Sequence, residues 1–342
     1  MRAEGVMPNK VSYSTAINAC SRGGQWQRGL SLLAEMQEAG VAPDQVNYNT
    51  AIKACYRGGQ WQPALSLLAE MRAAGVAPDK ISYNTAMKAC AEGGEPEPER
   101  TLSLLTEMRA AGIMPDQVSY STAINACSKL GQWERALSLL AEMRATGIAP
   151  DKVDYNTAIR ACAEGGEPER ALSLLQEMRE AGVAPDKVSY STAMNAWARG
   201  GQWQPALSLL VEMQEAGVAP DTVSYNTAIK ACAEGGEPER ALSLLKNMIA
   251  VGVVPNGVSY STAIYACCKG GQWQRALSLL KVMCVAGIAP DNGDYNIAVK
   301  ACAEGGEPER ALAVLEAMRL AGIVPEKVSF RDVIDACVEG GQ

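Results

Sequence analysis

A tyrosine that recurs at a fixed interval constrains the fold of this chain more than any other feature. The interval is 35 residues, with one step of 37 that contains the extra Glu-Pro of "EPEPER" at 95–100. A constant period of this length is typical of repeat arrays, in which each repeat is one supersecondary element packed on its neighbours. The recurring residues are Tyr13, Tyr48, Tyr83, Tyr120, Tyr155, Tyr190, Tyr225, Tyr260 and Tyr295.

The period divides the 342-residue chain into nine full repeats over residues 10–326. Residues 1–9 are interpreted as the tail of a truncated repeat, and residues 327–342 as a partial tenth repeat. Such ends lack a capping neighbour, so apolar residues such as Val333, Ile334 and Cys337 predict fraying or end-to-end self-association. The full repeats begin at Lys10, Gln45, Lys80, Gln117, Lys152, Lys187, Thr222, Gly257 and Asn292.

Each repeat predicts two antiparallel helices. The first carries an apolar stripe at helical spacing, as at Tyr13, Ile17 and Cys20, and a Gly-Gly pair ends it. The second opens with segments such as "QWQRALSLL" or "EPERALSLL" and ends at "AGVAPD", where glycine and proline stop a helix. No segment alternates with the period of a strand. We therefore expect an all-α fold, an α-solenoid of helix-turn-helix repeats.

Composition excludes several function classes. The chain has no histidine, which rules out Ser-His-Asp and Cys-His catalysis and zinc sites with histidine ligands. The carboxylates repeat identically along the chain, whereas an active site needs one unique constellation. We therefore expect no enzymatic activity, no cofactor and no metal. We also expect no membrane insertion, because no apolar run approaches about 20 residues. The net charge of -7 argues mildly against indiscriminate binding to nucleic acid.

Cysteines occupy one slot of most repeats, always after an alanine. None forms a Cys-x-x-Cys motif, so a zinc or redox site has little support. We interpret them as small buried hydrophobes in a reducing compartment. They are Cys20, Cys55, Cys90, Cys127, Cys162, Cys232, Cys267, Cys302 and Cys337.

Variation between repeats is concentrated on one face of the first helix. With each repeat numbered from its first residue, positions 5, 9 and 13 share a helical stripe. Position 5 is always Ser or Asn, which can donate to and accept from base edges. Regularly spaced cations can neutralise phosphates, although a solvated surface that merely records duplication would look similar. The cations are Lys53, Lys88, Arg160, Lys230 and Lys300 at position 9, and Arg22, Arg57, Lys129, Arg199 and Lys269 at position 13.

Segments such as "VSYNTAIKACAEGGEPERALSLLKNM" resemble pentatricopeptide repeats of the plain 35-residue type over essentially the whole chain. The marks are the period, the V-x-Y-[NS]-T start, the A-L-x-L-L-x-x-M helix and the G-[VI]-x-P-[DN] end. The resemblance implies a right-handed superhelix lined by the first helices. It also implies an organellar protein, of chloroplast or mitochondrion, that binds single-stranded RNA with one repeat per nucleotide.

The resemblance further implies that position 5 and the last position of each repeat recognise the base, and that an aliphatic residue at position 2 sandwiches it. Ser with Asp then favours G, Asn with Asp favours U, and Asn with Asn favours a pyrimidine, which predicts 5′-GUUGUG(C/U)GN-3′. The ninth repeat departs from this pattern, with Glu326 at its end and Gly293 at position 2. The recognition residues are Ser14, Asp44, Asn49, Asp79, Asn84, Asp116, Ser121, Asp151, Asn156, Asp186, Ser191, Asp221, Asn226, Asn256, Ser261, Asp291 and Asn296, and the sandwiching residues are Val11, Val46, Ile81, Val118, Val153, Val188, Val223 and Val258.

Some of these residues also have ordinary structural roles, and a second function is open. An Asp after Pro at a loop-to-helix junction is a good N-cap, so the last-position Asp is expected to cap the next helix as well. Tryptophans such as Trp26 and Trp203 open second helices, away from the polar stripe, and predict packing between repeats rather than base stacking. A protein-binding scaffold or structural subunit of an organellar complex is the alternative function, and near-identical copies also fit a designed chain.

Overall fold

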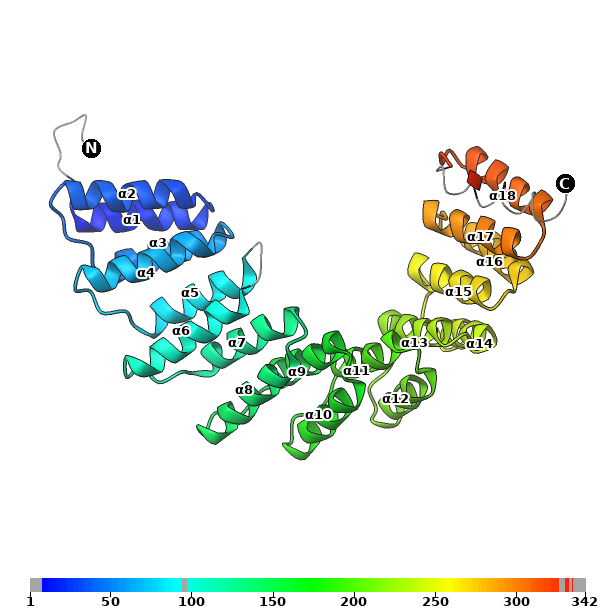
Figure 1. Cartoon of the computed structure of the whole chain (residues 1–342), viewed down its shortest axis with the longest axis horizontal. Helices are drawn as coiled ribbons and strands as arrows, with labels where there is room; N and C mark the ends of the chain where they lie inside the picture. Colours follow the sequence, from blue (N-terminus) through cyan, green and yellow to red (C-terminus); the bar gives the residue numbers. More distant parts are fainter. Residues whose placement is uncertain (1–7, 94–96, 326–329, 332–333, 335–342) are drawn as a thin grey trace. The chain divides into compact units, whose positions relative to one another are not determined.

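The computed structural model describes residues 8–93, 97–325, 330, 331 and 334, and within these ranges it contains eighteen α-helices and no strand (Figure 1). None of the described helices is long and apolar enough to cross a lipid bilayer. The first helices of the repeats are α1 (Lys10–Arg22), α3 (Gln45–Arg57), α5 (Lys80–Glu92), α7 (Gln117–Lys129), α9 (Lys152–Gly165), α11 (Lys187–Arg199), α13 (Thr222–Glu234), α15 (Gly257–Lys269) and α17 (Asn292–Glu304). The second helices are α2 (Trp26–Glu38), α4 (Trp61–Ala73), α6 (Pro98–Ala110), α8 (Trp133–Ala145), α10 (Pro168–Glu180), α12 (Trp203–Glu215), α14 (Pro238–Ala250), α16 (Trp273–Val285) and α18 (Pro308–Leu320).

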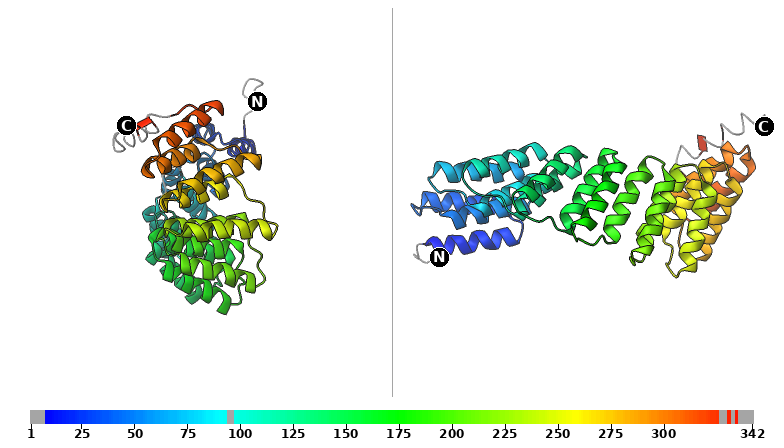
Figure 2. Two further views of the ribbon diagram at one scale, coloured as in Figure 1. Left: turned by 90° about the vertical axis from the view of Figure 1, so that its right-hand side faces the viewer. Right: turned by 90° about the horizontal axis from the view of Figure 1, so that it is seen from below.

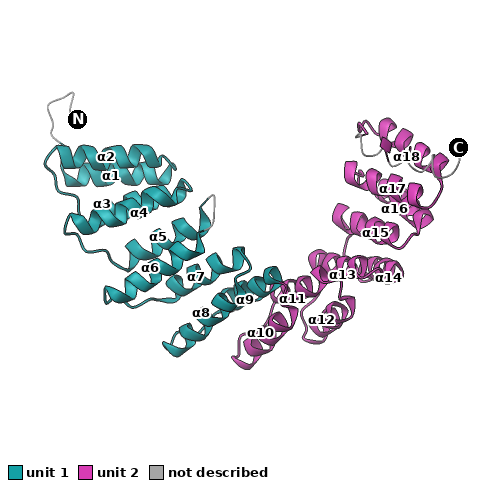
Figure 3. Cartoon of the chain, viewed as in Figure 1, with its two compact units in different colours: residues 1–165 teal, residues 166–342 magenta. Residues whose placement is uncertain are grey.

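The chain divides into two compact units, residues 1–165 and 166–342 (Figure 3). In unit 1, the first helices α1, α3, α5, α7 and α9 pack side by side in chain order, and in unit 2 α11, α13, α15 and α17 do the same. Within each unit, second helices pack against the first helix that follows them, so the helices form paired layers (Figure 2). The all-helical solenoid expected from the sequence is confirmed. The right-handed superhelix and the end-to-end association stay predictions, and most of the partial tenth repeat, with Val333 and Cys337, lies outside the described residues.

Glycines with positive φ end both helices of a repeat. In the second repeat, Gly59 has a φ of 68° and Gly75 a φ of 73°. At each of these turns the residue after the glycine donates its backbone N–H to the helix, as from Gln60 to the Cys55 carbonyl at 2.9 Å. Only glycine adopts this left-handed conformation without strain. Most first helices therefore end just before the glycine pair, whereas α7 ends before Leu130 and α9 extends to Gly165.

The core of each repeat is the apolar stripe of its first helix. In the second repeat Tyr48, Ile52 and Cys55 are fully buried, and so is Met71 of the paired helix α4. In the first repeat Cys20 is only half-buried, because no described helix precedes α1 on that side.

Tryptophans at the starts of second helices pack between repeats. A Cβ added to Gly235 would lie 2.6 Å from Trp203 Cδ1, so the indole rests directly on the backbone of the next repeat. Trp273 lies against Gly305 in the same way. This supports packing as the role of these rings, in agreement with the sequence interpretation.

Candidate nucleic-acid interface

The last residue of a repeat caps the first helix of the next repeat. Asp79 accepts the backbone N–H of Ser82 at 2.9 Å, and its own N–H donates to the Ser82 hydroxyl at 3.1 Å. This reciprocal arrangement is a capping box, which satisfies backbone donors at the helix start. The expected capping role is therefore confirmed. Equivalent boxes join Asp44 with Asn47, Asp116 with Ser119, Asp186 with Ser189, Asn256 with Ser259, and Asp291 with Asp294.

Asparagine at position 5 joins this box across the repeat boundary. The Asn49 amide donates to Asp79 Oδ1 at 3.1 Å, and its carbonyl accepts from the Ser82 hydroxyl at 2.6 Å. Burial acts to raise the pKa of Asp79, but hydrogen bonds from Ser82 and Asn49 outweigh it and lower that pKa. The predicted recognition pair is thus in direct contact in these repeats. The same chain of bonds links Asn84 to Asp116 and Ser119, and Asn226 to Asn256 and Ser259.

Serine at position 5 behaves differently, because its side chain is shorter. Ser14 donates to the Lys10 carbonyl at 2.9 Å, and Ser261 donates to the Gly257 carbonyl at 2.8 Å. Among the described residues, neither hydroxyl reaches the last residue of its own repeat. In these two repeats the pair therefore flanks the same junction without a hydrogen bond between its members. Of the remaining predicted residues, Asn156 lies in α9 of unit 1, Asp186 caps α11 of unit 2, Asn296 lies in α17, and Glu326 falls outside the described residues.

Position 3 of each repeat is a member of this junction that sequence reasoning missed. Its side chain lies between position 5 of the preceding repeat and the capping residue, as Ser82 lies between Asn49 and Asp79. Ser82 and Ser119 are completely buried. The available signal was a polar residue three positions after an N-cap, which is the usual mark of a capping box.

Aliphatic side chains at position 2 stand in solvent. Val11 is 70% exposed, and even the most covered of the eight, Val118, is 42% exposed. Branched aliphatic side chains are normally buried, because exposing them forgoes hydrophobic free energy. These positions thus offer one apolar contact per repeat to a ligand, next to the capping junction. The others are Val46, Ile81, Val153, Val188, Val223 and Val258.

Cations at position 9 are mostly free to meet a ligand. Among the described residues, Lys53, Lys88 and Lys230 take part in no ion pair or hydrogen bond of their side chains. Arg160 donates to the Asn125 carbonyl oxygen at 2.7 Å, and Lys300 lies 3.7 Å from Glu304. The three unpaired lysines fit the predicted contact with phosphates.

Cations at position 13 have protein partners that the sequence interpretation did not foresee. Arg57 donates to the Ser21 carbonyl at 3.2 Å, and Lys129 to the Ala91 carbonyl at 2.8 Å. Lys269 donates to the carbonyl of Glu234 and also pairs with its carboxylate, both at 2.9 Å. Each of these cations thus sits at the negative end of the preceding first helix, where it is favoured by the helix dipole. For Lys269, the acidic position 13 of the preceding repeat, Glu234, supplies the carboxylate partner.

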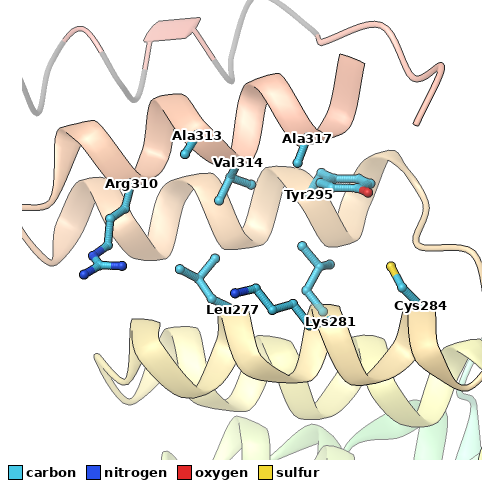
Figure 4. Close-up of a pocket in the computed structure, with 9 residues that line it drawn as sticks. Leu277, Lys281, Cys284, Tyr295, Arg310, Ala313, Val314 and Ala317 are labelled. Atoms are coloured by element: carbon cyan, nitrogen blue, oxygen red, sulfur yellow. The ribbon is translucent and has the colours of Figure 1, made fainter. Parts of the chain in front are cut away.

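The opposite side of the solenoid, formed by second helices, carries a different pattern. In unit 1, Arg72 stacks on Tyr83 at 5.5 Å and pairs with Glu107 at 2.6 Å. In unit 2, Arg179 stacks on Tyr190 at 5.7 Å in the same way, but the corresponding tyrosine of the ninth repeat, Tyr295, adjoins Cys284 in an apolar cavity of about 270 Å³ lined by α16, α17 and α18 (Figure 4). None of the nine residues that line this cavity occupies position 2, 5, 9 or 13 of its repeat.

Family comparisons agree with this geometry. The PPR repeat family matches residues 8–57, 43–92 and 220–269, and the pentacotripeptide-repeat region of PRORP matches residues 99–240. A PPR repeat matches residues 258–288, and a pentatricopeptide repeat domain matches residues 278–340. The chain belongs to the pentatricopeptide repeat family. A comparison with curated proteins finds no match.

One solved pentatricopeptide repeat structure shares this fold, and others match it with lower TM-scores. The crystal structure of PPR10 from maize is 22% identical, with a TM-score of 0.53, over 100% of this chain and 58% of that protein. A complex of PPR10 with an 18-nt psaJ RNA element is 21% identical over 96% of this chain and 58% of that one, with a TM-score of 0.48. The PPR domain of Arabidopsis thaliana protein-only RNase P 1, solved with tRNA, is 18% identical over 54% of this chain and 97% of that domain, with a TM-score of 0.47. This chain thus spans little more than half the length of the maize protein.

Proposed function

We propose that this pentatricopeptide repeat protein binds single-stranded RNA sequence-selectively, with one nucleotide per repeat and no chemical step. The observation that carries the proposal is the repeated pairing of an exposed aliphatic residue with a hydrogen-bonded polar junction. Val46 and Ile81, for example, are 61% and 62% exposed on either side of the Asn49 and Asp79 pair. Aliphatic contact with a base face and polar contact with its edge together suit single-stranded RNA, whose unstacked bases expose both.

The chemistry of the side chains assigns a different role in RNA binding to each position of the repeat. Position-2 aliphatics of successive repeats hold a base by its faces, while position 5 and the last position meet its edge. Lys53, Lys88 and Lys230 neutralise phosphates, and this contact carries no sequence information. With the family's pairing, the preferred RNA is 5′-GUUGUG(C/U)GN-3′. We assign no phosphate contact to the position-13 cations that donate to carbonyls at the end of the preceding first helix.

Such binding acts passively on RNA in a chloroplast or mitochondrion. A bound array covers its segment against nucleases and keeps it out of hairpins, which supports stabilisation, processing or translation of the transcript. The alternative is a scaffold that binds proteins. It is favoured by the net charge of -7 and by the apolar cavity beside Cys284 on the second-helix side of unit 2.

The decisive experiment is a salt-dependent gel shift with the predicted RNA and with a permuted RNA of identical composition. A variant that replaces Val188, Val223 and Val258 by Ala removes three aliphatic contacts from unit 2 and should weaken binding by roughly tenfold or more, since each buried CH₂ contributes about 0.8 kcal/mol. The matched control replaces Val211, Val251 and Val285, which are 52%, 56% and 89% exposed elsewhere. It should bind RNA as the parent protein does. If the parent shifts neither RNA, the scaffold becomes the leading function.

A further inference from the structure

Three repeats that have serine at position 5 differ in a buried residue, position 3 of the following repeat, which is too deep to touch a base. The position-5 hydroxyl of each contacts position 3 of the following repeat, and that partner is an amide, a carboxyl group or a hydroxyl. Asn47 donates to Ser14 Oγ at 2.7 Å, Ser121 bonds to Asp154, and Ser191 lies 3.1 Å from Ser224. Asn47, Asp154 and Ser224 are at most 1% exposed. The chemistry of this buried partner decides where the serine hydrogen points.

In the first repeat the partner is an obligate donor. The Asn47 amide nitrogen can only donate, so Ser14 accepts there and commits its single hydrogen to the Lys10 carbonyl at 2.9 Å. The Ser14 hydroxyl therefore offers the interface a lone pair and no hydrogen.

In the fourth repeat the partner is a carboxyl group. Ser121 has two acceptors for one hydrogen, namely the Gln117 carbonyl at 2.7 Å and Asp154 Oδ1. The other oxygen of Asp154 accepts the Asp151 N–H at 3.0 Å. Burial raises the pKa of Asp154, and the facing carboxylate of Asp151 raises it further, while the bond from Ser121 acts in the opposite direction. Whether Asp154 is ionised or protonated, the Ser121 hydrogen stays inside the protein and the hydroxyl again offers only a lone pair.

In the sixth repeat the partner is a second hydroxyl, which can donate or accept. Ser224 also reaches Asp221 Oδ1 at 3.1 Å, so its hydrogen has a choice of two acceptors. Among the described residues, Ser191 makes no bond to the carbonyl of Lys187, unlike the other serines. Ser191 can therefore turn its hydrogen either inward or toward a ligand.

We propose that position 3 of the following repeat is a third specificity-determining residue, which acts through the position-5 serine. Asn or Asp there makes the serine an acceptor only, whereas Ser leaves it able to donate or accept. The inference rests on the proposed RNA binding. It predicts stronger discrimination between bases at the first and fourth nucleotides than at the sixth. A hydroxyl that can only accept rejects base edges without a donor, whereas a hydroxyl that can donate or accept binds both kinds of edge. The residue at position 3 is a positioning residue, since it does not touch the base.

The test exchanges the buried partners. Asn47 already forms a capping box with Asp44, so Ser224→Asn should cap through Asp221 in the same way. It should fix Ser191 as an acceptor and raise the ratio between the best-bound and worst-bound base at the sixth nucleotide by about fivefold or more. The reverse change, Asn47→Ser, should lower that ratio at the first nucleotide by a similar factor. Binding of RNAs altered at other nucleotides should stay as in the parent protein.

A third pair of variants, Asp154→Asn and Asp154→Ser, gives a readout that a purely structural role would not move. Asp154→Asn should keep Ser121 an acceptor and leave discrimination at the fourth nucleotide as in the parent protein, whereas Asp154→Ser should lower it, because the hydroxyl could then donate or accept. Unchanged discrimination in both Ser224→Asn and Asn47→Ser, with RNA still bound tightly, overturns this inference alone. A parent protein that binds no RNA overturns it together with the proposed function.

Discussion

The Asn49 amide donates to Asp79 Oδ1 at 3.1 Å, and the same carboxylate oxygen accepts the backbone N–H of Ser82 in the first turn of α5. One atom thus holds a helix start and orients the polar group of the preceding repeat. Substitutions at such a junction therefore affect both the folding of α5 and the proposed recognition of RNA, and the two effects must be measured separately.

Substitution of Asp79 separates the two roles. Asp79→Ala removes the N-cap and should lower the free energy of unfolding by about 1 kcal/mol, within the usual range of about 0.5–2 kcal/mol. Asp79→Asn should keep the cap, as Asn256 does for α15, and relax the second nucleotide from U toward either pyrimidine. Urea unfolding measures the first effect, and competition with RNAs altered at that nucleotide measures the second. Equal stability of Asp79→Ala and the parent protein would contradict the capping role.

Replacing Ser191 by Asn should switch a base preference. Asn84 occupies the same position against Ser119 that Ser191 occupies against Ser224, so asparagine is compatible with a serine at the buried partner position. With Asp221 unchanged, preference at the sixth nucleotide should move from G toward U by roughly 5- to 150-fold, since an unpaired polar group costs about 1–3 kcal/mol. Ser208→Asn, on the exposed side of α12, is the control and should leave specificity as it was. An unaltered preference in Ser191→Asn, with RNA bound, would refute modular recognition.

Neighbouring cations of α3 should have different effects. Lys53 has no protein partner among the described residues, so Lys53→Ala should weaken all RNAs alike and reduce the slope of log K against log salt by about one. Arg57 holds the Ser21 carbonyl at 3.2 Å, so Arg57→Ala should mainly lower stability, by about 0.3–1 kcal/mol. Titrations at several salt concentrations and urea unfolding distinguish the two. The assignment fails if Arg57→Ala alone flattens the salt dependence.

Two glycines at the same position of successive repeats should respond oppositely to alanine. At Gly235 a Cβ would meet Trp203 Cδ1 at 2.6 Å, and overpacking of this kind typically costs about 1–3 kcal/mol. At Gly200 the nearest atom would be 3.7 Å away, and the φ of -88° suits alanine. Gly200→Ala should therefore be neutral or stabilising by about 0.4–1 kcal/mol. Thermal unfolding of both variants checks the packing of tryptophan between repeats.

Thiol labelling should divide the cysteines by burial. Burial raises the pKa of Cys55 to about 11 and that of Cys90 to about 12, so their reactive thiolates are scarce at neutral pH. Cys284 is exposed and should react first with a disulfide reagent in the native protein. Cys284→Ser should remove the fast phase. A fast phase of unchanged amplitude would contradict this assignment.

The sequence by itself determined the helices and the array. The stripe of Tyr48, Ile52 and Cys55 and the glycines after each helix are local signals, read within one or two turns of chain. The family resemblance then marked positions 2, 5 and the last position, and the structure places them around one junction.

Only the tertiary structure revealed the contacts between residues one repeat apart. The cation Arg57 belongs to a helix end in the preceding repeat, and Asp154 lies buried against Ser121 although aspartate is normally exposed. Both depend on how first helices stack side by side, which sets which residues about 35 positions apart come into contact. A local period carries no information on that stacking, because the same amphipathic pattern would bury its apolar stripe in any register of the neighbouring helix.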